Sequence, residues 1–128
     1  DERDAWAFGV EADLLADLVL KGEKTATASA YDLYALADEA LPQEGIFDII
    51  LDSQDQAVCI VEITKVSVQP FHQVSVDHAF KEGEGDKSLA YWRQVHEDFF
   101  KDCFGEAVQA FTPDSKVVLE EFRKVYPL

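Results

Sequence analysis

Helical periodicity is strongest over residues 88–103. Apolar side chains and one histidine recur there at the 3.6-residue spacing of an amphipathic helix: Leu89, Trp92, His96, Phe99, Phe100 and Cys103. Shorter helices are expected over residues 11–21, 31–40 and 75–80. Ser75 can cap the last of these, while Gly22 and Gly83 are placed to end helices in a left-handed conformation.

Extended patterns occupy residues 24–29, 46–51, 58–68 and 116–125. In the longest apolar run, a period of two puts Glu62 on the face that carries Ile60 and Val66. A carboxylate on such a face is costly unless it finds a hydrogen-bond partner or changes its pKa. Helices and strands do not alternate regularly, so the order of elements predicts an α+β fold rather than a wound parallel sheet.

Length and composition indicate one globular domain over residues 1–128. The chain has 128 residues, of which 48% are hydrophobic and 29% charged, with no linker, repeat or biased segment. A chain of this size can bury a core without the help of a disulfide or a metal.

The charge balance restricts the partners. The chain has 26 acidic and 11 basic residues and a formal net charge of −15. Such a surface repels phosphates and anionic lipids, so duplex DNA and membranes are not expected as partners. Cys59 and Cys103 lie far apart in apolar runs, which favours free thiols and a cytoplasmic location.

Common cofactor and metal motifs are missing from the sequence. The run Glu82-Gly83-Glu84-Gly85-Asp86 lacks the Gly-Lys-Ser/Thr ending of a phosphate loop, and its carboxylates would repel phosphate. The three histidines have no metal-ligand spacing. The acidic loop could hold a hard cation, but a solvated loop is the preferred interpretation, and no metal or cofactor is predicted.

Several segments together resemble the ASCH domain family. They are Gly22-Glu23-Lys24-Thr25-Ala26-Thr27-Ala28-Ser29, the loop 82–89, Tyr91-Trp92-Arg93 with His96, and Trp6-x-Phe8-Gly9. The resemblance covers nearly the whole chain. It implies a PUA-like fold, which is a small, curved, mostly antiparallel β-barrel with peripheral helices.

The resemblance also implies a function and a site. ASCH domains are thought to bind or act on RNA or its nucleosides in a cleft beside the Gly-x-Lys motif. One bacterial branch hydrolyses the amide of acetylated cytidine with a Lys, a Thr and a Glu, which correspond here to Lys24, Thr27 and Glu82. A Glu on the central strand of that branch corresponds to Glu62. Ser29 stands where the broader family often has Arg, which removes one cation from the expected cleft.

Amide hydrolysis needs a nucleophile, a base and an acid. Thr27 could attack, Lys24 could take its proton after desolvation, and Glu82 could protonate the leaving nitrogen. In this interpretation Lys24, Thr27, Glu62 and Glu82 should meet in one pocket. The structural alternative is a salt bridge from Lys24 to Glu62 or Glu82, with Thr27 as an ordinary strand residue.

Further substrate-binding residues are expected around these groups. Thr25 and Ser29 alternate with Thr27 and would form a hydroxyl floor. The other candidates are Glu62, Glu84, Trp92, Arg93 and His96, although core packing for Trp92 and His96 and an ion pair for Arg93 remain open.

The expected ligand is a nucleoside, a nucleotide or a short single-stranded RNA. The alternatives are a ribonuclease acting on single-stranded RNA and a non-catalytic RNA-binding or regulatory module. In the ribonuclease, Lys24 would stabilise the phosphorane charge while a carboxylate or His96 moves protons. The oligomeric state stays open.

Overall fold

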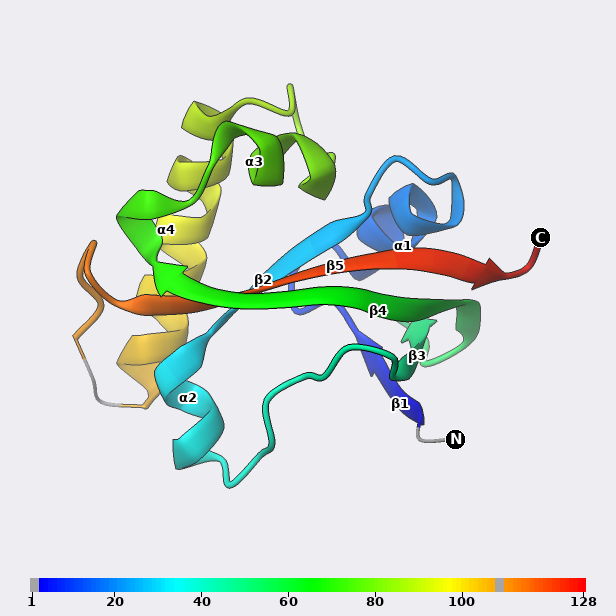
Figure 1. Ribbon diagram of the computed structural model, residues 1–128, viewed down its shortest axis with the longest axis horizontal. Helices are drawn as coiled ribbons and strands as arrows, with labels where there is room; N and C mark the ends of the chain where they lie inside the picture. The colour runs from blue at the N-terminus through cyan, green and yellow to red at the C-terminus, as the bar shows by residue number, and fades with distance from the viewer. Residues whose placement is uncertain (1–2, 108–109) are drawn as a thin grey trace.

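The computed structural model describes residues 3–107 and 110–128 as one α+β unit (Figure 1). Its elements are β1 (Arg3–Ala7), α1 (Ala12–Leu20), β2 (Ala26–Ala30), α2 (Tyr31–Leu36), β3 (Phe47–Leu51), β4 (Ala57–Pro70), a 3-10 turn (Phe71–Gln73), α3 (Val76–Glu82), α4 (Leu89–Glu106) and β5 (Lys116–Tyr126). The predicted helices and strands are all present, while β1 was not predicted.

The five strands form one curled sheet in the order β1-β3-β4-β5-β2. The β1–β3 pair is parallel and the other three pairs are antiparallel. The long strands β4 and β5 run side by side across the molecule, as Figure 1 shows. Register shifts along this pair help to bend the sheet into a half-barrel, which confirms the curved, mostly antiparallel fold.

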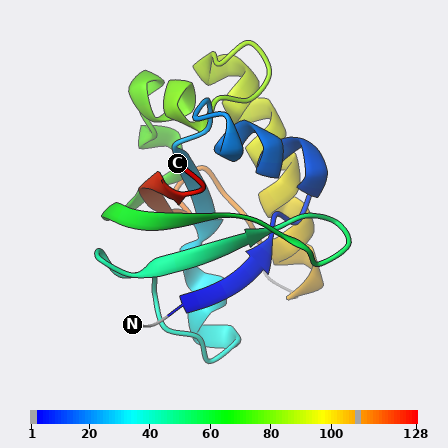
Figure 2. The same cartoon turned by 90° about the vertical axis from the view of Figure 1, so that its right-hand side faces the viewer.

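Two apolar clusters pack helices against the sheet. The first joins the 3-10 turn, α3, α4, β2 and β5, and it includes Phe71, Trp92, Phe100, Phe104 and Leu119. Residues of α1, β3, β4 and β5 form the second, which includes Val19, Ile50, Val61 and Phe122. Helices α1 and α4 lie on the same side of the curled sheet (Figure 2). The cavity between these two helices is therefore open towards the strands.

Local capping sets the limits of the two helices that carry the site. The Ser75 and Ser88 side chains accept hydrogen bonds from the backbone of His78 and Tyr91 at the starts of α3 and α4. Gly83 ends α3 with φ 73°, as predicted, although α3 extends two residues beyond the predicted Phe80. The second helix is shorter than predicted and ends at Leu36.

The face of β4 that carries Glu62 is not the buried one. Cys59, Val61 and Ile63 are buried, whereas the even positions around Glu62 are only half-buried or exposed. The Glu62 carboxylate therefore has its hydrogen-bond partner at the surface: Arg123 Nη2 donates to its Oε1 at 2.6 Å.

Both cysteines are free thiols. Within the described part of the chain, no helix is both long and apolar enough to cross a membrane.

Candidate functional site

A cavity of about 990 Å³ lies between α1, α4 and the concave side of the sheet. Helix α1, the turn before it and β1 form one wall, while β2, β3 and β5 form the floor. Aromatic side chains line much of the opening: Trp6, Phe8, Tyr34, Tyr91 and Phe99. A cavity of this size with aromatic walls and a few convergent polar groups is typical of a small-molecule site.

Lys24 lines this cavity and is buried, with 1% of its surface exposed. Its Nζ lies 3.2 Å from Glu82 Oε1 and 2.7 Å from Glu84 Oε2, and 5.3 Å from the centre of the Phe8 ring. We call Lys24, Glu82 and Glu84 the Lys24 end of the cleft.

Gly83 makes the approach of these segments possible. A Cβ atom at this position would overlap the carbonyl oxygen of Glu23, and the positive φ is itself unfavourable for other residues. The end of α3 therefore lies directly against the Glu23–Lys24 backbone, and the Glu82 carboxylate meets the ammonium. This explains why the glycine-acid loop and the Gly-x-Lys motif belong to one site although 58 positions separate Lys24 from Glu82.

The Glu82 carboxylate is almost saturated with partners. His78 Nε2 lies 2.8 Å from Oε2 and Trp92 Nε1 donates to the same oxygen at 2.6 Å, while His96 Nε2 lies 3.4 Å from Oε1. Burial alone would raise the pKa of Glu82. The charge of Lys24 and the hydrogen bonds from His78 and His96 outweigh burial and hold this pKa well below its usual value. Glu82 is therefore a carboxylate near neutral pH.

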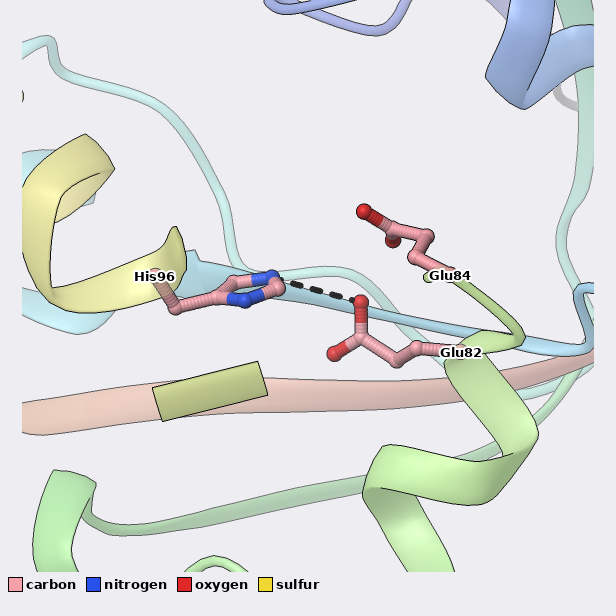
Figure 3. A group of neighbouring side chains, drawn as sticks. All are labelled: Glu82, Glu84 and His96. Carbon is pink, nitrogen blue, oxygen red and sulfur yellow. Dashed lines mark ion pairs between the residues drawn. The ribbon is translucent and has the colours of Figure 1, made fainter. Parts of the chain in front are cut away.

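Glu82, Glu84 and His96 also meet the spacing of a metal site, since one ligand atom of each lies within 4.8 Å of the others. Figure 3 shows the three side chains converging from α3, the following loop and α4. The Lys24 ammonium lies between the two carboxylates and already supplies positive charge there. The chemistry of the group is therefore that of an ion pair, and the absence of a metal stays a prediction.

A second pair of carboxyl groups, Asp48 and Glu120, lines the same cavity, and we call this pair the Asp48 end. Asp48 on β3 accepts a hydrogen bond from Trp6 Nε1 at 3.0 Å. Glu120 on β5 lines the same cavity with 7% of its surface exposed. Burial, followed by the negative charges of Asp48 and Glu82, raises the pKa of Glu120 to about 7. The pKa values of Glu82 and Glu120 are thus shifted in opposite directions.

Thr27 lies on β2 and lines the same cavity. Its neighbour across the sheet is Glu120, and both residues line the cavity. Ser29 lines it as well, with its Oγ 2.6 Å from the Tyr34 hydroxyl. Six of the predicted residues line this one cavity: Lys24, Thr27, Ser29, Glu82, Glu84 and His96.

Four predicted positions lie outside the cavity lining. Glu62 is paired with Arg123, so its expected convergence with Lys24 is wrong. Thr25 lies just before β2, and its hydroxyl donates a hydrogen bond to the Lys81 carbonyl oxygen. Trp92 is buried behind Glu82. Arg93 points away from the cleft, with Nη2 donating to the His72 carbonyl oxygen.

Sequence reasoning missed Asp48, His78 and Glu120. Asp48 interrupts an apolar strand, and Glu120 shares a strand face with Val118 and Phe122, both of which are buried. The same rule that singled out Glu62 therefore applies to both. This rule does not distinguish which of Asp48, Glu62 and Glu120 faces the cleft.

Comparisons with known proteins agree with this architecture. The sequence profile of the ASCH domain matches residues 4–126. A crystal structure of an ASCH domain from Lactobacillus crispatus is 40% identical, with a TM-score of 0.93 over 98% of this chain and 80% of that one. A crystal structure of an Enterococcus faecalis protein is 39% identical, with a TM-score of 0.88 over 95% of this chain and 76% of that one.

A more distant structure shares only the fold. The ASCH protein from Zymomonas mobilis is 10% identical, with a TM-score of 0.57 over 94% of this chain and 65% of that one. No match was found among curated proteins. The match over residues 4–126 and the two structures at about 40% identity establish the family. The chain belongs to the ASCH domain family.

Proposed function

We propose that the cleft binds a nucleoside and hydrolyses an amide on its base, as in cytidine acetylated on the exocyclic nitrogen. The observation that carries this proposal is the meeting of Lys24, Thr27 and Glu82 in one cavity lined by aromatic side chains. Aromatic walls suit a flat base, and the cavity is large enough for a nucleoside.

The charge of the lining favours a neutral nucleoside over a nucleotide or RNA. Six of the described lining residues are acidic, namely Glu11, Glu39, Asp48, Glu82, Glu84 and Glu120, and Lys24 is the only lysine or arginine among them. That ammonium is already shared by two carboxylates. The net negative charge of this cleft would repel a phosphate. A sugar and an uncharged base carry no charge and would not be repelled.

The roles in the reaction follow from the contacts. The Thr27 hydroxyl attacks the acyl carbon, the bond to the exocyclic nitrogen breaks, and water then hydrolyses the acyl ester. Because its ammonium faces two carboxylates, Lys24 is better placed to stabilise negative charge on the carbonyl oxygen than to take a proton. Glu82, an ionised group with four partners, holds Lys24 in position rather than acting as the acid.

The test is turnover of acetylcytidine, with cytidine and acetate separated by chromatography. Lys24→Met and Thr27→Ala should each lower kcat/KM by about 10²–10⁴-fold, the contribution of a positioned catalytic group. Arg93→Gln is the matched control, since Arg93 lies near the site in sequence but outside the cavity. Absence of turnover by the wild type, or wild-type rates in both variants, would refute the proposal.

Cleavage of short single-stranded RNA is the second candidate. One observation favours it: His96 lines the same cavity as Lys24, which offers an imidazole and an ammonium for phosphoryl chemistry. The acidic lining opposes it. Binding of a labelled oligonucleotide should therefore be weak and should weaken further as salt rises through about 0.1–0.5 M. Tight binding at the higher salt would reverse the ranking of the two candidates.

A further inference from the structure

We propose that Glu120 is the proton-transfer residue of this cleft, taking the proton of the Thr27 hydroxyl and returning it to the leaving nitrogen. The inference rests on the proposed amide hydrolysis. It goes beyond that proposal by assigning the acid–base step to a residue of β5 that lies outside the Gly-x-Lys motif and the glycine-acid loop.

The sheet register supplies the geometry. Thr27 and Glu120 are directly opposite each other on the antiparallel strands β2 and β5. Side chains at such positions extend to the same face with their Cβ atoms about 4.5–5.5 Å apart. Both line the cavity, so a substrate carbonyl over Thr27 would also lie beside Glu120. Catalytic hydrogen bonds often shorten only when a substrate binds, so the two groups need no direct bond in the empty cleft.

The other candidates for this step are occupied. Glu82 is ionised and bound by Lys24, His78 and Trp92. The second nitrogen of the His96 ring, Nδ1, lies 2.9 Å from the Trp92 carbonyl oxygen, so both of its nitrogens face acceptors. Within residues 3–107 and 110–128, no hydrogen bond offsets the effects that raise the pKa of Glu120.

The causes that shift the pKa of Glu120 all act in one direction. From β3 and α3, Asp48 and Glu82 raise its pKa after burial, which is the larger cause. From α2, Tyr34 stays neutral, because burial raises the pKa of its hydroxyl more than the hydrogen bond with Ser29 lowers it. The remaining titratable groups of the lining are Lys24, Glu84, Tyr91 and His96, together with Glu11 and Glu39. With a pKa of about 7, Glu120 can both accept and donate a proton near neutral pH.

The proposed step balances with water as the only co-reactant. The Glu120 carboxylate takes the hydroxyl proton as Thr27 Oγ1 bonds to the acyl carbon. The resulting carboxylic acid protonates the exocyclic nitrogen as the carbon–nitrogen bond breaks, which releases cytidine. Glu120 then deprotonates the water that attacks the acyl-threonine ester and passes this proton to Thr27 Oγ1 as the ester bond breaks. The product leaves as acetic acid, which gives its proton to solvent and becomes acetate.

The test is the pH dependence of kcat/KM for acetylcytidine between about pH 5 and 9. The wild-type rate should rise through a pH near the Glu120 pKa of about 7. Glu120→Gln should lower the rate by about 10²–10⁴-fold and remove this rise. Asp48→Asn should keep the rise but move it to lower pH, because a negative charge beside Glu120 is lost. The control Glu121→Gln, on the other strand face and bound to Lys81, should change neither rate nor profile.

Each result decides one of the two proposals. A Glu120→Gln protein with the wild-type rate and profile would overturn the role of Glu120 and leave amide hydrolysis standing. A wild type without turnover would overturn both. If circular dichroism shows that Glu120→Gln does not fold, Asp48→Asn decides instead, and an unmoved profile in that variant would overturn the inference.

Discussion

The Lys24 end and the Asp48 end each contain a buried carboxyl group, Glu82 and Glu120, and the pKa values of these two groups are shifted in opposite directions. Glu82 has 1% of its surface exposed and Glu120 has 7%. At the Lys24 end, an ammonium and several hydrogen-bond donors hold the pKa of Glu82 well below its usual value although burial opposes them. At the Asp48 end, burial and neighbouring negative charge raise the pKa of Glu120 to about 7. Partners, rather than depth of burial, decide the state of a buried carboxyl group.

This difference gives the two ends opposite effects on stability as pH changes. The lowered pKa of Glu82 means that its contribution is present above the unfolded-state pKa near 4.5 and is lost as pH falls through the folded value. The raised pKa of Glu120 means that its contribution is present below about 4.5 and is lost as pH rises towards about 7. As far as these two groups govern it, stability should be greatest in mildly acidic solution.

The largest expected effect comes from breaking the Lys24 end. Glu82→Gln leaves the half-buried Glu84 as the carboxylate partner of the Lys24 ammonium within the described part of the chain. Removing one member of a buried ion pair typically costs about 3–5 kcal/mol. We expect a loss of this size in the free energy of unfolding, measured by urea denaturation at neutral pH. A loss below about 1 kcal/mol would show that Lys24 gains little from Glu82.

The second largest effect is expected in the pH dependence of stability at the Asp48 end. Glu120→Gln cannot ionise, so it should remove the loss of stability that the wild type suffers between about pH 4.5 and 7. The rise in pKa from 4.5 to about 7 corresponds to about 3 kcal/mol. Relative to the wild type, the variant should therefore gain up to that amount at pH 8 and little at pH 4.5. Parallel stability curves for the two proteins would contradict the raised pKa.

A pair of tryptophan substitutions compares the ends directly, since each end has an indole N–H bonded to a carboxylate. Trp92 Nε1 donates to Glu82 at 2.6 Å and Trp6 Nε1 to Asp48 at 3.0 Å. A hydrogen bond to a charged group contributes about 1.5–3 kcal/mol. Trp92→Phe should cost more than Trp6→Phe, because Trp92 is buried and its bond is shorter. Thermal denaturation of both variants measures the difference. A larger loss of stability in Trp6→Phe than in Trp92→Phe would show that the hydrogen bond to Glu82 contributes less than the one to Asp48.

The smallest effect is expected outside the cleft, at the Glu62–Arg123 pair. Its nitrogen and oxygen are only 2.6 Å apart, but 67% of the Arg123 side chain is exposed. Exposed pairs contribute about 0–1 kcal/mol. Glu62→Gln is therefore the control for Glu82→Gln in the same urea measurement. A cost similar to that of Glu82→Gln would mean that burial does not distinguish the two pairs.

The sequence determined the local elements and several residues of the candidate site. The period of the apolar residues in α4 and the caps at Ser75 and Gly83 depend on a few neighbouring residues, so they could be predicted. The resemblance supplied the fold and the grouping of Lys24, Thr27 and Glu82. Strand β1 was missed because it is short and pairs with β3, more than 40 residues away in the chain.

The tertiary structure alone decided which carboxylates face the cleft and in what state. Glu62, Asp48 and Glu120 each interrupt an apolar strand, and nothing local distinguishes them. The register and curl of the sheet turn Glu62 towards Arg123 and direct Glu120 into the cavity beside Asp48. Burial and Coulomb interactions act through space between strands and helices that are distant in the chain, so the opposite pKa shifts of Glu82 and Glu120 exist only in the assembled fold.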